Sequence, residues 1–204
     1  MDNIILYEYD GNHGKNNLYV NLTNACTNKC RFCIRDYDVM EKDLWLEHQP
    51  TFTEFKAELD KKDLSNYKEV IFCGFGEPML NYATLIQAAK YLREVTEMPI
   101  RLNTNGQANL FLKRDVTPEM KGLFDTVSIS LNASSKEAYN ELCLPADKEN
   151  AFDAVLEFTK KVKEVVPHVV MSVVDTFIDD AEIEKCRKIA EDIGVEFRVR
   201  KFES

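Results

Sequence analysis

The sequence contains little glycine and proline and no long apolar stretch. Its 204 residues include 7 Gly and 6 Pro, which excludes collagen-like and low-complexity disordered chains. No run approaches the roughly 18 apolar residues of a membrane-spanning helix, so we expect no contact with a membrane. The first residues lack the basic start, apolar run and small-residue cleavage site of a signal peptide. We therefore expect a cytoplasmic protein.

Basic residues are outnumbered by acidic ones. The 26 Lys and Arg against 35 Asp and Glu give a net charge of −9. General nucleic-acid binding is not expected of such a chain, because phosphate contact needs a basic face. A local basic pocket is still compatible with this charge. The length is sufficient to bury a core without disulfides or metals as staples, and we expect a single domain over residues 1–204.

Hydrophobic periodicity predicts alternating strands and helices. We expect strands at residues 4–9, 18–23, 69–73, 100–104, 126–131, 169–174 and 195–201, with a turn at 10–14. The expected helix signals are the capping pairs Thr51 with Glu54, Ser134 with Glu137 and Asp179 with Glu182, the N-cap Asn81 and the C-cap Gly194. The last six of these strands are separated by helices, which predicts a mostly parallel sheet in an α/β fold.

Four of these strands have one polar and one apolar face. The polar faces carry Tyr19, Asn21 and Thr23; Arg101, Asn103 and Asn105; Thr126, Ser128, Ser130 and Asn132; and Arg198 and Arg200. This pattern fits a sheet curled around a wet cavity, with helices on the apolar outside, which is a partial (β/α)6 TIM-type barrel. A flat sheet with one solvated face is the alternative, but parallel sheets seldom leave a face open. In barrels of this type the chemistry lies at the carboxyl ends of the strands.

Three of the six cysteines lie within eight residues, directly after the second strand: Cys26, Cys30 and Cys33. In a reducing compartment, clustered thiols indicate metal binding or catalysis more often than disulfides. Three cysteines can hold three corners of a cubane cluster and leave one iron open, whereas ferredoxin spacings supply four thiolates.

A zinc site is the alternative use of these three cysteines, with His13 or His48 as the fourth ligand. The other cysteines lack ligand-like spacing, and we expect buried thiols at Cys73, Cys143 and Cys186.

The segment Cys26-Thr-Asn-Lys-Cys30-Arg-Phe-Cys33 resembles the signature of the radical S-adenosylmethionine (SAM) superfamily. That signature has three cysteines separated by three and then two residues, with an aromatic, here Phe32, before the last. Gly74-Phe75-Gly76-Glu77-Pro78 is similar to the family's Gly-Gly-Glu-Pro turn, with Phe75 in place of one glycine. The whole chain resembles a minimal radical SAM core, and most closely the TatD-associated radical SAM proteins, a name that implies no known reaction.

The resemblance implies a cofactor set and a reaction. Cys26, Cys30 and Cys33 would hold a [4Fe–4S] cluster whose open iron chelates S-adenosylmethionine. Reduction of the cluster would cleave S-adenosylmethionine to methionine and a 5′-deoxyadenosyl radical, which takes a hydrogen atom from a substrate. The expected cofactor contacts are Phe32, Gly76, Glu77, Asn103, Asn105, Ser128, Ser130 and Asn132. Glu77 is expected to pair with the ammonium of the methionine moiety, and no protein acid, base or nucleophile is assigned.

The substrate is not defined by the sequence. Arg198 and Arg200 could bind a carboxylate or phosphate, or could instead pair with the acidic surface. The family's chemistry implies an electron donor such as flavodoxin or ferredoxin. A zinc-binding interaction module and an iron–sulfur electron carrier are the competing classes, but a carrier would lack the turns at residues 76–77 and 103–106.

Overall fold

The computed structural model describes residues 3–9, 17–37 and 44–202, and the strands in these ranges form one seven-stranded sheet in sequential order. The strands are β1 (Leu6–Tyr9), β2 (Asn17–Val20), β3 (Val70–Phe72), β4 (Ile100–Thr104), β5 (Thr126–Ser130), β6 (His168–Val174) and β7 (Glu196–Arg200). β1 is antiparallel to β2, and every later neighbour pairs in parallel. The α/β fold is thus confirmed, with one antiparallel edge strand.

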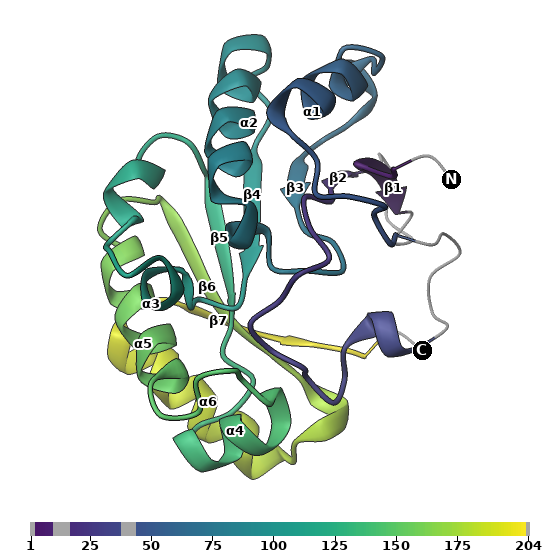
Figure 1. Cartoon of the computed structure of the whole chain (residues 1–204). Coiled ribbons are helices and arrows are strands. Elements are labelled where there is room, and N and C mark those ends of the chain that lie inside the picture. The colour runs from purple at the N-terminus through teal and green to yellow at the C-terminus, as the bar shows by residue number, and fades with distance from the viewer. Residues whose placement is uncertain (1–2, 10–16, 38–43, 203–204) are drawn as a thin grey trace.

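α-Helices follow the strands and cover one side of the sheet, while the other side carries no α-helix in the part of the chain described (Figure 1). The α-helices are α1 (Phe52–Leu59), α2 (Tyr82–Val95), α3 (Ala108–Leu112), α4 (Lys136–Cys143), α5 (Ala151–Val162) and α6 (Asp180–Ile193). Short 3-10 turns are η1 (Ile34–Asp36), η2 (Leu64–Asn66), η3 (Pro78–Asn81), η4 (Thr117–Met120) and η5 (Asp175–Phe177). None of the described helices is long and apolar enough to cross a bilayer.

The core lies between the sheet and these helices. Leu102 and Ile129 are 0% exposed and belong to one apolar cluster with side chains of α1, α2 and α5. The other face of the same strands is polar, since Asn103 pairs in register with Ser128 and Ser172 pairs with both Ser130 and Arg198. The predicted parity of the strands is therefore confirmed.

Local capping explains where several helices begin. Thr51 and Glu54 form the predicted capping box of α1, Asp179 caps α6, and Gly194 ends α6 with φ +81°. One predicted cap, Ser134, is wrong. α4 is capped by Ser135, whose side chain accepts from the Ala138 N–H.

Asn81 occupies the N-cap position of α2 as predicted, but its side chain makes no capping hydrogen bond. It donates to the carbonyls of Leu22 and Pro50 at 3.0 and 2.8 Å, because a buried amide satisfies whichever tertiary partner lies within reach. Several predicted strands are also one to three residues too long, including the second, which ends at Val20. The turn predicted at residues 10–14 lies outside the described residues.

Candidate functional site

The cysteine loop, residues 21–33, leaves the carboxyl end of β2 and leads into η1. Its three thiols are partly exposed. Among the described residues, no three Cys, His, Asp or Glu side chains already surround a single-ion position. His48, one of the two candidate fourth ligands for zinc, lies 2.6 Å from Glu54 of α1. His13, the other, lies outside the described residues.

Burial and neighbouring groups raise the pKa of all three thiols. Burial, and secondarily the charge of Glu77, raises the pKa of Cys26 to about 12. Burial also raises the pKa of Cys33, and the neighbouring Cys143 thiol raises that of Cys30. Ligation to iron would favour the thiolate instead, because a metal-bound thiol is deprotonated. A set of three such thiols and no carboxylate suits the soft-ligand chemistry of iron–sulfur clusters.

The turn after β3 lies directly against the cysteine loop. A Cβ on Gly76 would be 2.3 Å from the carbonyl oxygen of Thr23 and 2.5 Å from that of Ala25. The Glu77 N–H also donates to the Ala25 carbonyl at 2.8 Å. Glycine is thus required at position 76 because two backbones meet there.

Phe75 stands where the similar family motif has glycine, and it points away from this junction. It is 8% exposed and packs with Tyr7 and Leu44 in a small apolar cluster. The half-exposed Trp45 contacts its ring edge to face, with centroids 5.5 Å apart. The replacement therefore adds packing beside β1.

Glu77 connects the turns that follow β3 and β4. Its carboxylate accepts from the Thr104 hydroxyl and the Asn105 N–H, both at 2.7 Å, and from the Met79 N–H at 3.2 Å. It is 3% exposed, and burial raises its pKa to about 7 although the hydrogen bonds act in the opposite direction. Both carboxylate oxygens already serve the chain, a structural role that the sequence did not indicate.

The turn after β4 also contacts the cysteine loop. The Asn105 side chain donates to Thr27 Oγ1 at 2.7 Å and lies 3.9 Å from Cys26 Sγ. The carboxyl ends of β2, β3 and β4 are thereby brought together, as predicted for Cys26, Glu77 and Asn105. The remaining predicted side chains follow along the same polar face, from Asn103 to Ser128 and Ser130.

Buried amide oxygens on this side of the molecule have no donor among the described residues. They are Oδ1 of Asn21, Asn103 and Asn132. Asn132 is 2% exposed and adopts φ +62° directly after β5, a conformation that asparagine tolerates better than most residues. Unsatisfied buried acceptors are costly, so these atoms suit a ligand rich in hydroxyl and amino groups, such as a nucleoside with an amino-acid tail.

Two further predicted residues contact other side chains. Phe32 is 9% exposed and packs its ring 5.7 Å from that of Phe177. Arg198 is exposed and donates to Ser128 Oγ at 3.1 Å, away from the cysteine loop. Asn28, Gln107 and Tyr139, which sequence reasoning missed, form a buried hydrogen-bonded group against the loop.

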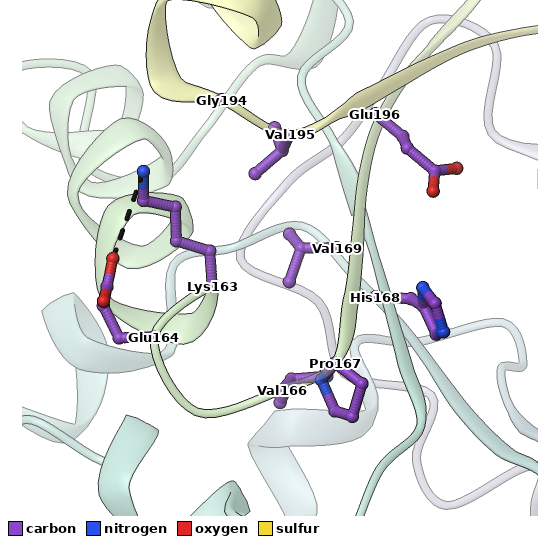
Figure 2. Close-up of a pocket in the computed structure, with 9 residues that line it drawn as sticks. All are labelled: Lys163, Glu164, Val166, Pro167, His168, Val169, Gly194, Val195 and Glu196. Carbon is purple, nitrogen blue, oxygen red and sulfur yellow. Dashed lines mark ion pairs between the residues drawn. The ribbon is translucent and has the colours of Figure 1, made fainter.

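The cavity drawn in Figure 2, of about 360 Å³, lies elsewhere. It is bounded by His168 and Glu196, the first residues of β6 and β7. It therefore opens at the amino ends of the parallel strands, opposite the edge that carries the cysteine loop. Lys163 and Glu164, which also line it, pair with each other at 4.0 Å. We therefore assign the functional site to the edge that carries the cysteine loop and Glu77, and not to this cavity.

Comparison with known proteins agrees with this assignment. The model of the "Radical SAM superfamily" matches residues 20–190. A probable dual-specificity RNA methyltransferase RlmN of Aquifex aeolicus is 25% identical over 142 residues, which cover 67% of this chain and 39% of the relative. The ribosomal RNA large subunit methyltransferase N of Nitrosopumilus maritimus is 30% identical over 92 residues, 43% of this chain and 26% of the relative. The chain thus spans well under half the length of these relatives.

Solved structures share the fold at low sequence identity. Streptococcus suis SuiB bound to precursor peptide SuiA superposes with a TM-score of 0.69 at 17% identity, covering 90% of this chain and 38% of that one. A radical SAM methyltransferase from Sphaerobacter thermophilus gives 0.60 at 16% identity, covering 96% and 68%. The partial TIM-type barrel expected from the sequence is the fold of these neighbours.

Proposed function

Because the chain belongs to the radical SAM superfamily, we propose that it reductively cleaves S-adenosylmethionine and starts hydrogen-atom abstraction from a substrate. The observation that carries this proposal is the junction of three turns, where Cys26, Asn105 and Glu77 are brought to one edge of the sheet. A [4Fe–4S] cluster and S-adenosylmethionine, the cofactors of this family, supply one-electron reduction and a hydrogen-abstracting radical when bound.

The chain's own residues would bind and orient these groups. The thiolates of Cys26, Cys30 and Cys33 would hold three irons. The polar face beside them would take the nucleoside, with Asn103, Ser128, Ser130 and Asn132 as hydrogen-bonding partners. Glu77 would face the methionine ammonium while it keeps the Asn105 turn in place. No side chain of the chain needs to accept or donate a proton in this scheme.

The substrate would lie along the polar face towards β7. Arg198 and Arg200 place positive charge there, which suits a carboxylate or phosphate. We do not extend the RNA substrates of the methyltransferase relatives to this chain, since a net charge of −9 disfavours broad contact with nucleic acid. The similarity of segments 18–24, 32–36, 73–78 and 101–106 to the TatD-associated group favours that group, and a flavodoxin or ferredoxin is the proposed electron donor.

Anaerobic reconstitution with iron and sulfide, reduction by dithionite and an assay for 5′-deoxyadenosine test the proposal. We expect a brown protein that forms 5′-deoxyadenosine from S-adenosylmethionine, and a Cys26→Ala variant that forms none. Colourless protein that binds zinc would support the interaction module. A reducible cluster without affinity for S-adenosylmethionine would support the electron carrier. Either result would overturn the proposal.

A further inference from the structure

We infer that Asn28, Gln107 and Tyr139 form a buried polar brace that holds the cysteine loop in its cluster-binding conformation. This inference rests on the proposed function, because it assigns the brace to the same cluster. The three residues come from three separate places: the cysteine loop, the turn after β4 and the middle of α4. They are 3%, 2% and 0% exposed, respectively.

The brace is a closed ring of hydrogen bonds. The Tyr139 hydroxyl oxygen accepts from Asn28 Nδ2 at 3.0 Å and from Gln107 Nε2 at 2.9 Å. Gln107 Nε2 also donates to Asn28 Oδ1 at 2.8 Å. Buried hydrogen-bonded networks of this kind favour one conformation, because any slip leaves donors without acceptors.

The brace contacts the cysteine loop between its first two cysteines. Asn28 lies between Cys26 and Cys30, and its own N–H donates to Cys26 Sγ at 3.4 Å. A hydrogen bond to a ligating sulfur also influences the reduction potential of an iron–sulfur cluster. The side chain of Asn28 therefore restrains the same residue whose backbone contacts the first ligand.

The last turn of α4 accepts hydrogen bonds from the cysteine loop on both sides of Cys30. The Lys29 N–H donates to the Cys143 carbonyl at 3.1 Å, and the Arg31 N–H donates to the Leu142 carbonyl at 3.0 Å. These carbonyls are ones that a helix end leaves without intrahelical partners. Tyr139 belongs to the same helix, so α4 contacts the loop through both its backbone and its brace hydroxyl.

Preorganisation is the physical reason for such a device. Ordering an irregular segment costs conformational entropy at every residue, and three thiolates must reach their irons together. A loop already fixed by the brace loses less conformational freedom when iron binds, so the cluster is retained longer. Asn28, Gln107 and Tyr139 would thus be positioning residues that act through Cys26 and Cys30.

Tyr139→Phe tests the hydroxyl separately from the ring. The ring packs against Phe152, with centroids 5.9 Å apart, and phenylalanine preserves this contact while two amide N–H donors lose their acceptor. Tyr67→Phe is the matched control. Tyr67 is also buried, at 8% exposure, but its hydroxyl donates at 2.6 Å to Glu8 of the edge strand β1.

The measurements are the rate at which a chelator removes iron from the anaerobic holoprotein, and the electron paramagnetic resonance spectrum and midpoint potential of the reduced cluster. We expect Tyr139→Phe to release iron about tenfold faster than wild type, with a shifted potential, because unsatisfied buried donors destabilise the held loop. Tyr67→Phe should match wild type in all three. Gln107→Met, which keeps chain length without the amide, should release iron as fast as Tyr139→Phe and serves if that variant does not fold.

The inference is overturned if both brace variants release iron at the same rate as Tyr67→Phe and have the same midpoint potential. Wild-type protein that retains a cluster but forms no 5′-deoxyadenosine would refute the proposed function alone, because iron release still reports on the brace. Wild-type protein that takes up no cluster would contradict both.

Discussion

The carboxylate of Glu77 accepts the backbone N–H of Asn105 at 2.7 Å, which joins the turns after β3 and β4. Asn105 in turn reaches Thr27 and Cys26 of the cysteine loop. Three segments far apart in the chain thus meet at one buried carboxylate. Substitution of Glu77 should therefore change both the stability of the fold and the affinity for the cofactor.

The ligand set can be tested by single substitutions. Cys26→Ala, Cys30→Ala and Cys33→Ala should each abolish the oxygen-sensitive brown chromophore, because a cluster held by three thiolates loses one anchored corner. Cys186→Ala should retain it, since Cys186 is 0% exposed within the core on α6. Visible absorption and iron analysis after anaerobic reconstitution provide the measurement. Loss of the chromophore in Cys186→Ala alone would show that the ligand assignment is wrong.

Affinity for S-adenosylmethionine should depend on Glu77. A charge-assisted contact with the ammonium contributes about 1.5–3 kcal/mol, so Glu77→Ala should weaken binding by roughly ten- to a hundredfold with unchanged iron content. Calorimetric titration of the reconstituted protein measures this. Thr104→Val is a useful companion, because it removes one hydrogen bond to Glu77 and leaves the carboxylate present. Unaltered affinity in Glu77→Ala would refute the contact.

The stability of the fold should depend on pH through the same residue. Burial raises the Glu77 pKa above its ordinary 4.5, to about 7. The folded state therefore favours the protonated carboxyl, and the stability this contributes is complete below pH 4.5 and lost as the pH rises through about 7. Relative to Glu77→Gln, which does not titrate, wild type should lose about 2 kcal/mol between about pH 5.5 and 7.

Denaturant unfolding of both proteins at several pH values checks this sign. If the stability of wild type instead rose with pH relative to Glu77→Gln, the hydrogen bonds from Thr104 and Asn105 would outweigh burial, and the pKa would lie below its ordinary value.

Gly76→Ala should displace the cysteine loop. The new Cβ would meet two backbone carbonyl oxygens, at 2.3 and 2.5 Å, and backbone cannot rotate away as a side chain can. We expect a loss of about 1–3 kcal/mol in unfolding free energy together with failure to retain iron. Gly122→Ala is the control, because no atom lies within 4 Å of its Cβ position, although φ +74° makes it strained by about 1 kcal/mol. Iron retention equal in both variants would contradict the close-packing argument.

Much of the fold follows from local patterns. The alternation of Arg101, Leu102 and Asn103 predicts which side of β4 faces the helices, because successive side chains of a strand point to opposite faces. The capping box of Thr51 and Glu54 places the start of α1 correctly, since its partners are three residues apart. The cysteine spacing indicates the cofactor class for the same reason: three ligands on one short loop need no knowledge of the rest of the molecule.

Contacts between distant segments are what the sequence alone did not determine. Ser134 was predicted to cap α4, yet its N–H donates to Glu182 of α6 at 2.8 Å, and the cap is Ser135. Two of the three partners of the Glu77 carboxylate are 27 and 28 residues away, and Tyr139 lies 111 residues from Asn28. The sequence alone determined the faces of the strands and the grouping of three cysteines on one loop, because periodicity and short spacing are local properties. Only the tertiary structure decided which buried polar groups satisfy one another around the cysteine loop, because a buried donor takes whatever acceptor the packed chain brings within about 3 Å.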